Sequence, residues 1–242
     1  MRKSYRFWQG LAALSLVFLP LLLLWCAWRN PPYKALLLFL GVSLSCVPFF
    51  FTFEAERPTA AQLMPLIILA AAAAAGRVLF AAVPNFKPVT AIVIIAGVTL
   101  GKNQGFLCGA LAALASNLFF GQGAWTPWQM FAWGLVGCLS GVLSRRGLLR
   151  SRLSAAIWGA LFSLLYGLIM DSWTVVGFIA PLTPAAALAA YGAGLPFSLI
   201  HALSTVLFLL LLYRPWCRII RRMQTKYIAA PPPPSPAHKE NI

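Results

Sequence analysis

The chain has 242 residues, of which 61% are apolar and only 10% are charged. A soluble domain usually carries about a quarter charged residues, so this composition excludes a soluble globular domain, a disordered chain and a disulfide scaffold. Only four residues are acidic, which excludes most chemistry that needs paired carboxylates. The composition therefore predicts an all-α integral membrane protein.

Hydropathy predicts eight apolar segments, at residues 7–28, 35–53, 62–83, 88–101, 105–120, 127–144, 153–170 and 193–213. The first begins after a basic start and is too long for a cleaved signal, so a retained signal-anchor helix is expected. The segments 88–101 and 105–120 would span only about 21–24 Å as helices. They are expected to lie inside the bundle or beside loops that enter the membrane.

The net charge of +15 is better explained by membrane topology than by nucleic-acid binding, because the basic residues lie between apolar stretches. With eight spans and a cytoplasmic N-terminus, 15 of the 19 Lys and Arg residues face the cytoplasm. This is the bias of the positive-inside rule. It predicts a multi-pass protein of the bacterial cytoplasmic (inner) membrane with both termini in the cytoplasm.

The turn at Arg57-Pro58-Thr59 and a change of composition after Tyr213 divide the chain into three parts. Residues 1–58 are predicted to form an N-terminal transmembrane helix pair, and residues 59–215 a six-helix core. Residues 216–242 are predicted to be a basic, Pro-rich cytoplasmic tail. Its arginines favour a short helix on anionic lipid headgroups, and Pro231–Pro234 favour a disordered end.

Small residues occur at helical spacing in several segments. The alanine run in the third segment contains two pairs four residues apart, Ala70/Ala74 and Ala71/Ala75. Such spacing lets helices approach closely in lipid, either within the bundle or against another subunit. For two glycine rows, Gly97-Gly101-Gly105-Gly109 and Gly134-Gly137-Gly141, packing within the bundle is the favoured interpretation. The five scattered cysteines contain no CxxC pair and are interpreted as packing residues, so no metal site is expected.

Polar residues in a bilayer are costly and often mark sites. Under the predicted topology, the outer loops and adjoining helix ends hold Arg77, Asn85, Lys87, Asn117, Gln122, Trp125, Trp128, Gln129, Trp133, Asp171 and Trp173. Apolar walls with a few hydrogen-bonding groups are typical of a ligand pocket. The alternative is an interfacial aromatic belt, which is favoured for Trp173 taken alone.

The remaining polar residues leave alternatives open. Asp171 has three candidate roles: a pair with Arg77, a cap for the 173–180 segment, or a ligand contact. His201 is expected to make a helix–helix hydrogen bond. Catalysis at Ser140 and His201 is disfavoured, since Cys138 stands where a serine-protease motif has glycine. No Walker A motif is present, so the chain is not expected to hydrolyse ATP. With catalysis disfavoured, the chain is not expected to be an enzyme.

The stretch from Ala70 to Gly141, and above all PNFKP at 84–88 and GQGAWTPWQ at 121–129, resembles the S component of an energy-coupling factor (ECF) transporter, cobalamin-type subgroup. The resemblance implies a six-helix core that binds a vitamin outside and delivers it inward. It implies a transmembrane coupling (T) subunit and two ABC-type ATPases as partners, with the alanine pairs as the coupling surface. The ligand would be cobalamin or a related corrinoid. No cofactor would be intrinsic, and ATP would be used only by the partners.

Under this hypothesis Trp125, Trp128 and Trp133 would supply stacking surface. The side-chain amides would bond polar edges of the ligand, and Arg77 and Lys87 would meet a phosphate or only anchor helix ends. Three alternatives stand beside it. The ligand could be another micronutrient or a modified-base precursor. The chain could be a lipid or prenyl enzyme, which the scarcity of acids for Mg²⁺ disfavours. It could also be a purely structural membrane subunit.

Overall fold

The computed structural model describes residues 2–227, and in this part of the chain it contains eight α-helices and no β-strand. The all-α prediction is therefore confirmed, and each predicted apolar segment corresponds to one helix. The helices are α1 (Arg2–Arg29), α2 (Lys34–Ala55), α3 (Ala60–Leu79), α4 (Val89–Leu100), α5 (Lys102–Phe120), α6 (Thr126–Arg145), α7 (Arg152–Phe178) and α8 (Pro184–Tyr227).

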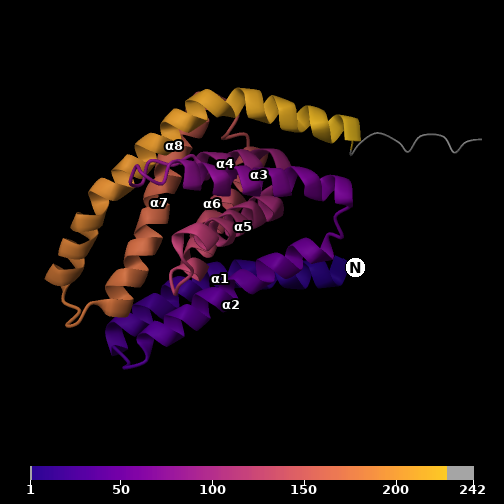
Figure 1. The fold of residues 1–242 in the computed structure, drawn as a ribbon. Coiled ribbons are helices and arrows are strands. Elements are labelled where there is room, and N and C mark those ends of the chain that lie inside the picture. Colours follow the sequence, from indigo (N-terminus) through magenta and orange to yellow (C-terminus); the bar gives the residue numbers. More distant parts are fainter. Residues whose placement is uncertain (1, 228–242) are drawn as a thin grey trace, which may run out of the picture.

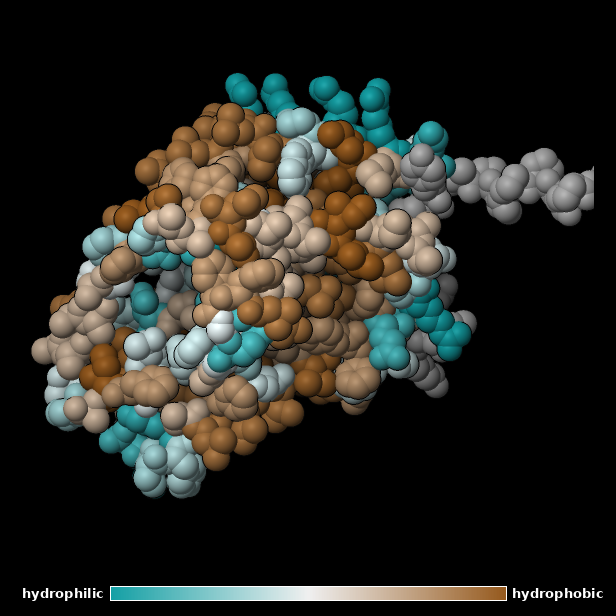
Figure 2. Space-filling view, in the orientation of Figure 1, coloured by the Kyte–Doolittle hydropathy of each residue, from teal (hydrophilic) through white to brown (hydrophobic). Residues whose placement is uncertain are grey.

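Five of these helices, α1, α2, α3, α7 and α8, are long and apolar enough to cross a membrane. The helix α4 is apolar but has only 12 residues, as expected from the short segment 88–101. Figure 2 shows apolar residues over most of the visible face, with hydrophilic residues along its upper and right edges and in its lower left part. The chain thus has the character of a multi-pass membrane protein.

The helices α4, α5 and α6 lie at the centre of the molecule (Figure 1). The hairpin of α1 and α2 packs along α6 and α5, and α7 pairs with α8. The turn between α1 and α2 contains Asn30, whose φ of 45° is tolerated by asparagine better than by most residues. The helices α1 and α2 pair with each other, and α2 makes most of their contacts with the rest of the bundle.

Glycines make the closest contacts at the centre. A Cβ atom added at Gly97, Gly105 or Gly137 would lie less than 3.0 Å from backbone atoms of a neighbouring helix. Helix backbones can approach this closely only where no side chain intervenes. The prediction that the two glycine rows pack within the bundle is thus confirmed at these positions.

The last helix, α8, runs without interruption for 44 residues and contains Pro196 and Pro215. The expected boundary at 215/216 therefore falls inside a helix. Figure 1 shows that α8 bends, so its C-terminal part lies over α3. A proline in a helix removes one hydrogen bond and bends the helix, and here packing holds the helix together beyond it.

The packing beyond Pro215 has an apolar and a polar contribution. Cys217 and Ile220 are buried in the same apolar cluster as Leu69 of α3. The Gln224 Nε2 atom donates a hydrogen bond of 3.1 Å to the Thr99 carbonyl at the end of α4. Residues 216–227 therefore pack as part of the bundle, while Pro231–Pro234 lie outside the described residues.

Candidate ligand-binding site

A cavity of about 240 Å³ lies between α7, α8 and the loop that joins α3 to α4. Its polar lining comes from Asn85 of the loop, from Ser163, Tyr166 and Asp171 of α7, and from Ser198 and His201 of α8. Gly167, Gly194, Met170 and Phe197 complete the wall. The cavity therefore combines one carboxylate, one imidazole, three hydroxyls and one amide with apolar surface.

Two glycines allow α7 and α8 to approach each other around this cavity. A Cβ atom at Gly167 would clash with the Ser198 side chain, and one at Gly194 would clash with the Asp171 carboxylate. Asp171 lies within α7, which continues to Phe178, so it does not cap a helix there. The hydrogen-bonding groups gathered here suit a small polar molecule.

The inner wall of the cavity rests on a hydrogen-bonded chain across three helices. The Thr90 hydroxyl lies 2.6 Å from His201 Nε2, and Trp133 Nε1 donates to the same hydroxyl at 2.9 Å. The Tyr166 ring stacks on Trp133 and on His201, with centroids 4.5 Å and 5.1 Å apart. The predicted helix–helix hydrogen bond of His201 is confirmed, and the same residue also lines the cavity.

Behind Trp133 lies the buried guanidinium of Arg77, which is only 8% exposed. Its Nη1 atom donates to Ser116 Oγ at 2.6 Å and to Asn117 Oδ1 at 2.7 Å. The Arg77 Cζ atom lies 4.8 Å from the ring centroid of Phe120 and 4.9 Å from that of Trp133. These neutral partners and ring faces hold the charge, rather than a pair with Asp171.

Three of the amides predicted to bind ligand form hydrogen bonds within the chain instead. Asn117 Nδ2 donates to Thr126 Oγ1 at 3.0 Å and to Gln129 Oε1 at 2.8 Å. Gln122 Oε1 accepts from the Thr126 hydroxyl at 2.9 Å, and its Nε2 donates to the Leu114 carbonyl. The structure thus brings Arg77, Asn117, Gln122, Gln129 and Trp133 together as one network that ties α3, α5 and α6 into a unit.

Lys87 lies in the loop between α3 and α4, with its Nζ atom 4.7 Å from the Phe120 ring centroid. Burial and then the nearby charge of Arg77 lower the pKa of Lys87. The Ser204 hydroxyl of α8 donates to the Lys87 carbonyl at 3.0 Å. Lys87 therefore anchors the loop that carries Asn85 to the cavity.

The other predicted tryptophans lie elsewhere. Trp128 is fully buried among the residues that join the α1–α2 hairpin to α6, and it stacks on Trp173 with centroids 6.3 Å apart. Trp125 precedes α6, is 40% exposed and covers Gly123. The expected hollow between the Asn85, Trp125 and Trp173 loops is not where the cavity lies. Of the predicted residues, Asn85 and Asp171 line it.

Sequence reasoning missed Tyr166, Ser163 and Ser198. Their helical spacing could have indicated them, because Ser163, Tyr166 and Gly167 fall on one face of α7. Gly194, Ser198 and His201 share a face of α8 in the same way. Two consecutive apolar helices with matching small and polar faces predict a contact between those faces. Among residues 2–227, no group of three or more His, Cys, Asp or Glu side chains is placed to hold a metal ion.

The model of one protein family matches residues 57–226, and it is described as a family of unknown function (DUF6580). The chain belongs to the DUF6580 family. Comparison with curated proteins and with solved structures gave no match. The match runs from the turn before α3 almost to the end of α8, so it includes every residue that lines the cavity. The helices α1 and α2 precede it.

In this DUF6580 protein the two alanine pairs of α3 lie on different faces. Ala70 and Ala74 are buried in the bundle, whereas Ala71 and Ala75 are exposed. Ile67 and Leu79, each four residues from one of this exposed pair, are 55% and 80% exposed. Within residues 2–227 this row of small and apolar residues is therefore exposed, while the other pair serves internal packing.

Two tryptophans of the DUF6580 protein form a matched pair for a stability prediction. Both substitutions remove the same part of a buried ring, and Trp133→Phe also removes the bond to Thr90. Trp128 Nε1 has no hydrogen-bond partner among the described residues, so we expect Trp133→Phe to cost about 1 kcal/mol more unfolding free energy than Trp128→Phe. Thermal unfolding of both variants in the same detergent checks this order. Equal losses would contradict it.

Proposed function

We propose that this chain is the substrate-binding subunit of an ECF-type ABC importer, which captures a micronutrient outside the cell and delivers it inward. The observation that carries the proposal is the polar cavity between α7 and α8, set among helices apolar enough to cross a membrane. The resemblance of residues 70–141 to S components supports the same conclusion. In this proposal the chain binds and carries its substrate but catalyses no reaction.

The volume of the cavity limits the size of the ligand that it can hold. Sites for drug-sized ligands are commonly ~300–1,000 Å³, and this cavity measures about 240 Å³. A whole corrinoid would enter only if α7 and α8 moved apart, so the volume favours a smaller micronutrient over cobalamin. Asp171 is the one carboxylate in the lining, which favours a ligand with a cationic or hydrogen-bond-donating group at that end.

The proposed partners are a transmembrane coupling (T) subunit and two ABC-type ATPases. The exposed row of Ala71 and Ala75 supports this, because small side chains let a partner helix approach closely. Since the row interlocks little with a neighbour, it would permit the binding subunit to rotate as a rigid body. The buried pair Ala70/Ala74 would contribute only by holding α3 in place.

We place the chain in the bacterial cytoplasmic membrane with both termini in the cytoplasm. The supporting observation is the distribution of charge, because Arg150 of the α6–α7 connection and four arginines at the end of α8 line one groove. Clusters of Lys and Arg beside membrane spans typically face the cytoplasm. In this orientation Asp171 lies towards the end of α7 that is far from the groove, and Asn85 lies in the loop that follows α3.

The test is a thermal-shift panel of micronutrients on the full chain purified in a neutral detergent, followed by titration calorimetry of any hit. We expect at least one small polar micronutrient to raise the melting temperature, and Asp171→Asn to weaken its binding at least roughly tenfold. Glu54→Gln, which removes an exposed carboxylate of α2 outside the cavity, is the matched control and should bind as the parent does.

Two results would contradict the proposed function. One is the absence of any stabilising micronutrient across the panel, which would favour a structural membrane subunit. The other is equal weakening by the two substitutions, which would place the ligand outside the cavity. Affinity purification from membranes that contain a T subunit and ATPases tests the partners independently, since the ATPases should be recovered with the chain.

A further inference from the structure

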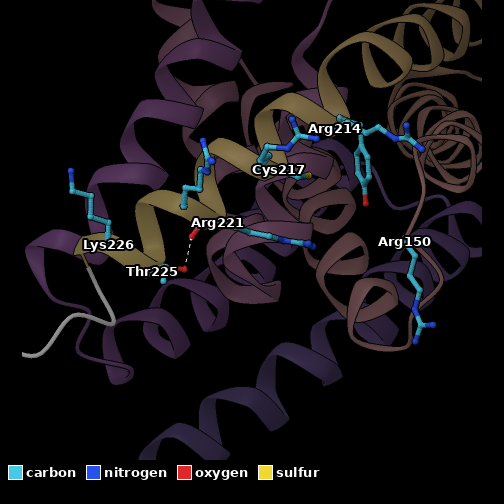
Figure 3. Close-up of a pocket in the computed structure, with 9 residues that line it drawn as sticks. Arg150, Arg214, Cys217, Arg221, Thr225 and Lys226 are labelled. Carbon is cyan, nitrogen blue, oxygen red and sulfur yellow. Dashed lines mark hydrogen bonds between the residues drawn. The ribbon is translucent and has the colours of Figure 1, made fainter.

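A second hollow, unrelated to the ligand cavity, lies at the C-terminal part of α8. It is a groove of about 760 Å³ between α8 and the connection from α6 to α7. Figure 3 shows the side chains that line it, with Arg150 on the connection and the other basic residues along α8. Its arginines are Arg150, Arg214, Arg218, Arg221 and Arg222, and among residues 2–227 no Asp or Glu lines it.

The groove is built by specific contacts. The buried Tyr213 side chain donates its hydroxyl hydrogen bond to the Leu149 carbonyl, which fixes the α6–α7 connection against α8. Arg150 follows Leu149 directly and is exposed, so this bond holds it at the edge of the groove. On the opposite side, Cys217 and Ile220 are buried against the bundle and fix the rotation of α8.

This rotation presents one charged face. Arg214, Arg218 and Arg222 are four residues apart and therefore lie in a row along the helix, and all three are exposed. Like charges at this spacing repel one another. A bound anion would relieve that repulsion, and the planar guanidinium group is suited to bidentate hydrogen bonds with phosphate.

The surroundings of the groove distinguish between possible anions. Leu211, which shares a face of α8 with Arg214 and Arg218, is 69% exposed, and Leu153, three residues after Arg150, is 64% exposed. An acidic protein segment would match the charge of the groove but not this exposed apolar surface. A phospholipid matches both, because its phosphate would meet the arginines while its acyl chains cover the leucine side chains.

We infer that this groove binds the headgroup of an anionic phospholipid of the cytoplasmic leaflet. Arg150 contributes from one side of the headgroup and the α8 arginines from the other, which makes this a defined site rather than a general attraction to the surface. Because the α6–α7 connection and α8 both contribute to it, an occupied site would clamp α8 to the start of α7. The inference stands independently of the nutrient bound in the ligand cavity.

The test measures binding of phosphatidylglycerol to the full chain in neutral detergent by native mass spectrometry, with phosphatidylcholine as the neutral lipid. The variant R150Q/R218Q/R222Q removes three groove charges, and we expect its phosphatidylglycerol affinity to fall roughly tenfold or more. The control R6Q/R29Q/R57Q removes three exposed charges elsewhere and should stay within about twofold of the parent. Arg150→Gln alone should account for part of the loss.

Competition experiments distinguish a lipid headgroup from the other anions that the groove could bind. Inorganic phosphate and a hexaglutamate peptide, each added at the concentration of the lipid, should not displace phosphatidylglycerol. Displacement by the peptide would overturn the inference in favour of an acidic protein partner, and displacement by phosphate would overturn it in favour of a free anion. Equal losses in the groove variant and the control would show attraction to net charge and would also overturn it. If the triple variant does not fold, the phosphatidylglycerol affinities of Arg150→Gln and Arg6→Gln are compared instead. A loss in Arg150→Gln alone supports the inference, and equal losses overturn it.

Discussion

Replacing Gly137 by alanine is expected to destabilise the bundle by about 3 kcal/mol, at the upper end of the usual cost of overpacking. A Cβ atom at Gly137 would lie less than 3.0 Å from backbone atoms of Gly105 in α5. Backbone cannot rotate aside as a side chain can, so α5 and α6 would have to separate. These two helices make the most extensive contact in the molecule, and a separation would also disturb the close approach of Gly97 in α4.

The same substitution at glycines without neighbours provides the control. Nothing lies within 4 Å of a Cβ atom added at Gly10 of α1 or Gly192 of α8. Because alanine has a better helix propensity than glycine, Gly10→Ala and Gly192→Ala are expected to gain about 0.5–1 kcal/mol. Unfolding free energies in mixed micelles measure all three variants. A Gly137→Ala protein as stable as the parent would contradict the tight crossing.

The helices could be predicted from the sequence because their signal is local. Apolar runs of sufficient length give one helix each, and the two short segments were expected inside the bundle, where α4 is found. The spacing of Gly97, Gly105 and Gly137 likewise predicted close packing. The continuation of α8 beyond Pro215 was not predicted, because it depends on a contact between Ile220 and the distant helix α3.

The candidate site was less predictable, for a physical reason. The sequence shows hydrogen-bonding groups but not their partners, and Asn117 donates to Gln129 and accepts from Arg77 instead of bonding a ligand. Trp128 and Trp133 share helix α6, yet Trp128 packs towards the α1–α2 hairpin and Trp133 towards Tyr166. The predicted topology puts Asn85 and Asp171 on the same outer side of the membrane but does not predict that they are close. The structure shows that both residues line one cavity.

Removing the Arg77 guanidinium is expected to affect both stability and ligand binding. Arg77→Met keeps most of the side-chain volume but leaves Asn117 Oδ1 without its donor in a buried site, which costs about 1–3 kcal/mol. The lost bond to Ser116 and the lost contact with two aromatic rings add to this, while relief of the buried charge subtracts from it. We expect a net loss of about 2–3 kcal/mol in unfolding free energy.

The comparison with Arg77→Lys separates these contributions. Lysine retains the charge but has no planar group to bond Ser116 and Asn117 while facing the Trp133 ring, so an intermediate loss is expected. If burial of the charge dominated, Arg77→Met would instead be more stable than both Arg77→Lys and the parent. Arg29→Met, at an exposed position, should change stability by less than about 0.5 kcal/mol.

The effect on the ligand follows from the position of Trp133. Its ring contacts both the Arg77 guanidinium and the Tyr166 ring, and its Nε1 atom donates to the Thr90 hydroxyl that bonds His201. Tyr166 and His201 form the inner wall of the cavity, so a shift of Trp133 moves that wall. We therefore expect Arg77→Met to weaken nutrient binding severalfold in calorimetry at a temperature where the variant is fully folded. Unchanged affinity together with reduced stability would show that the Arg77 network supports the bundle without positioning the site.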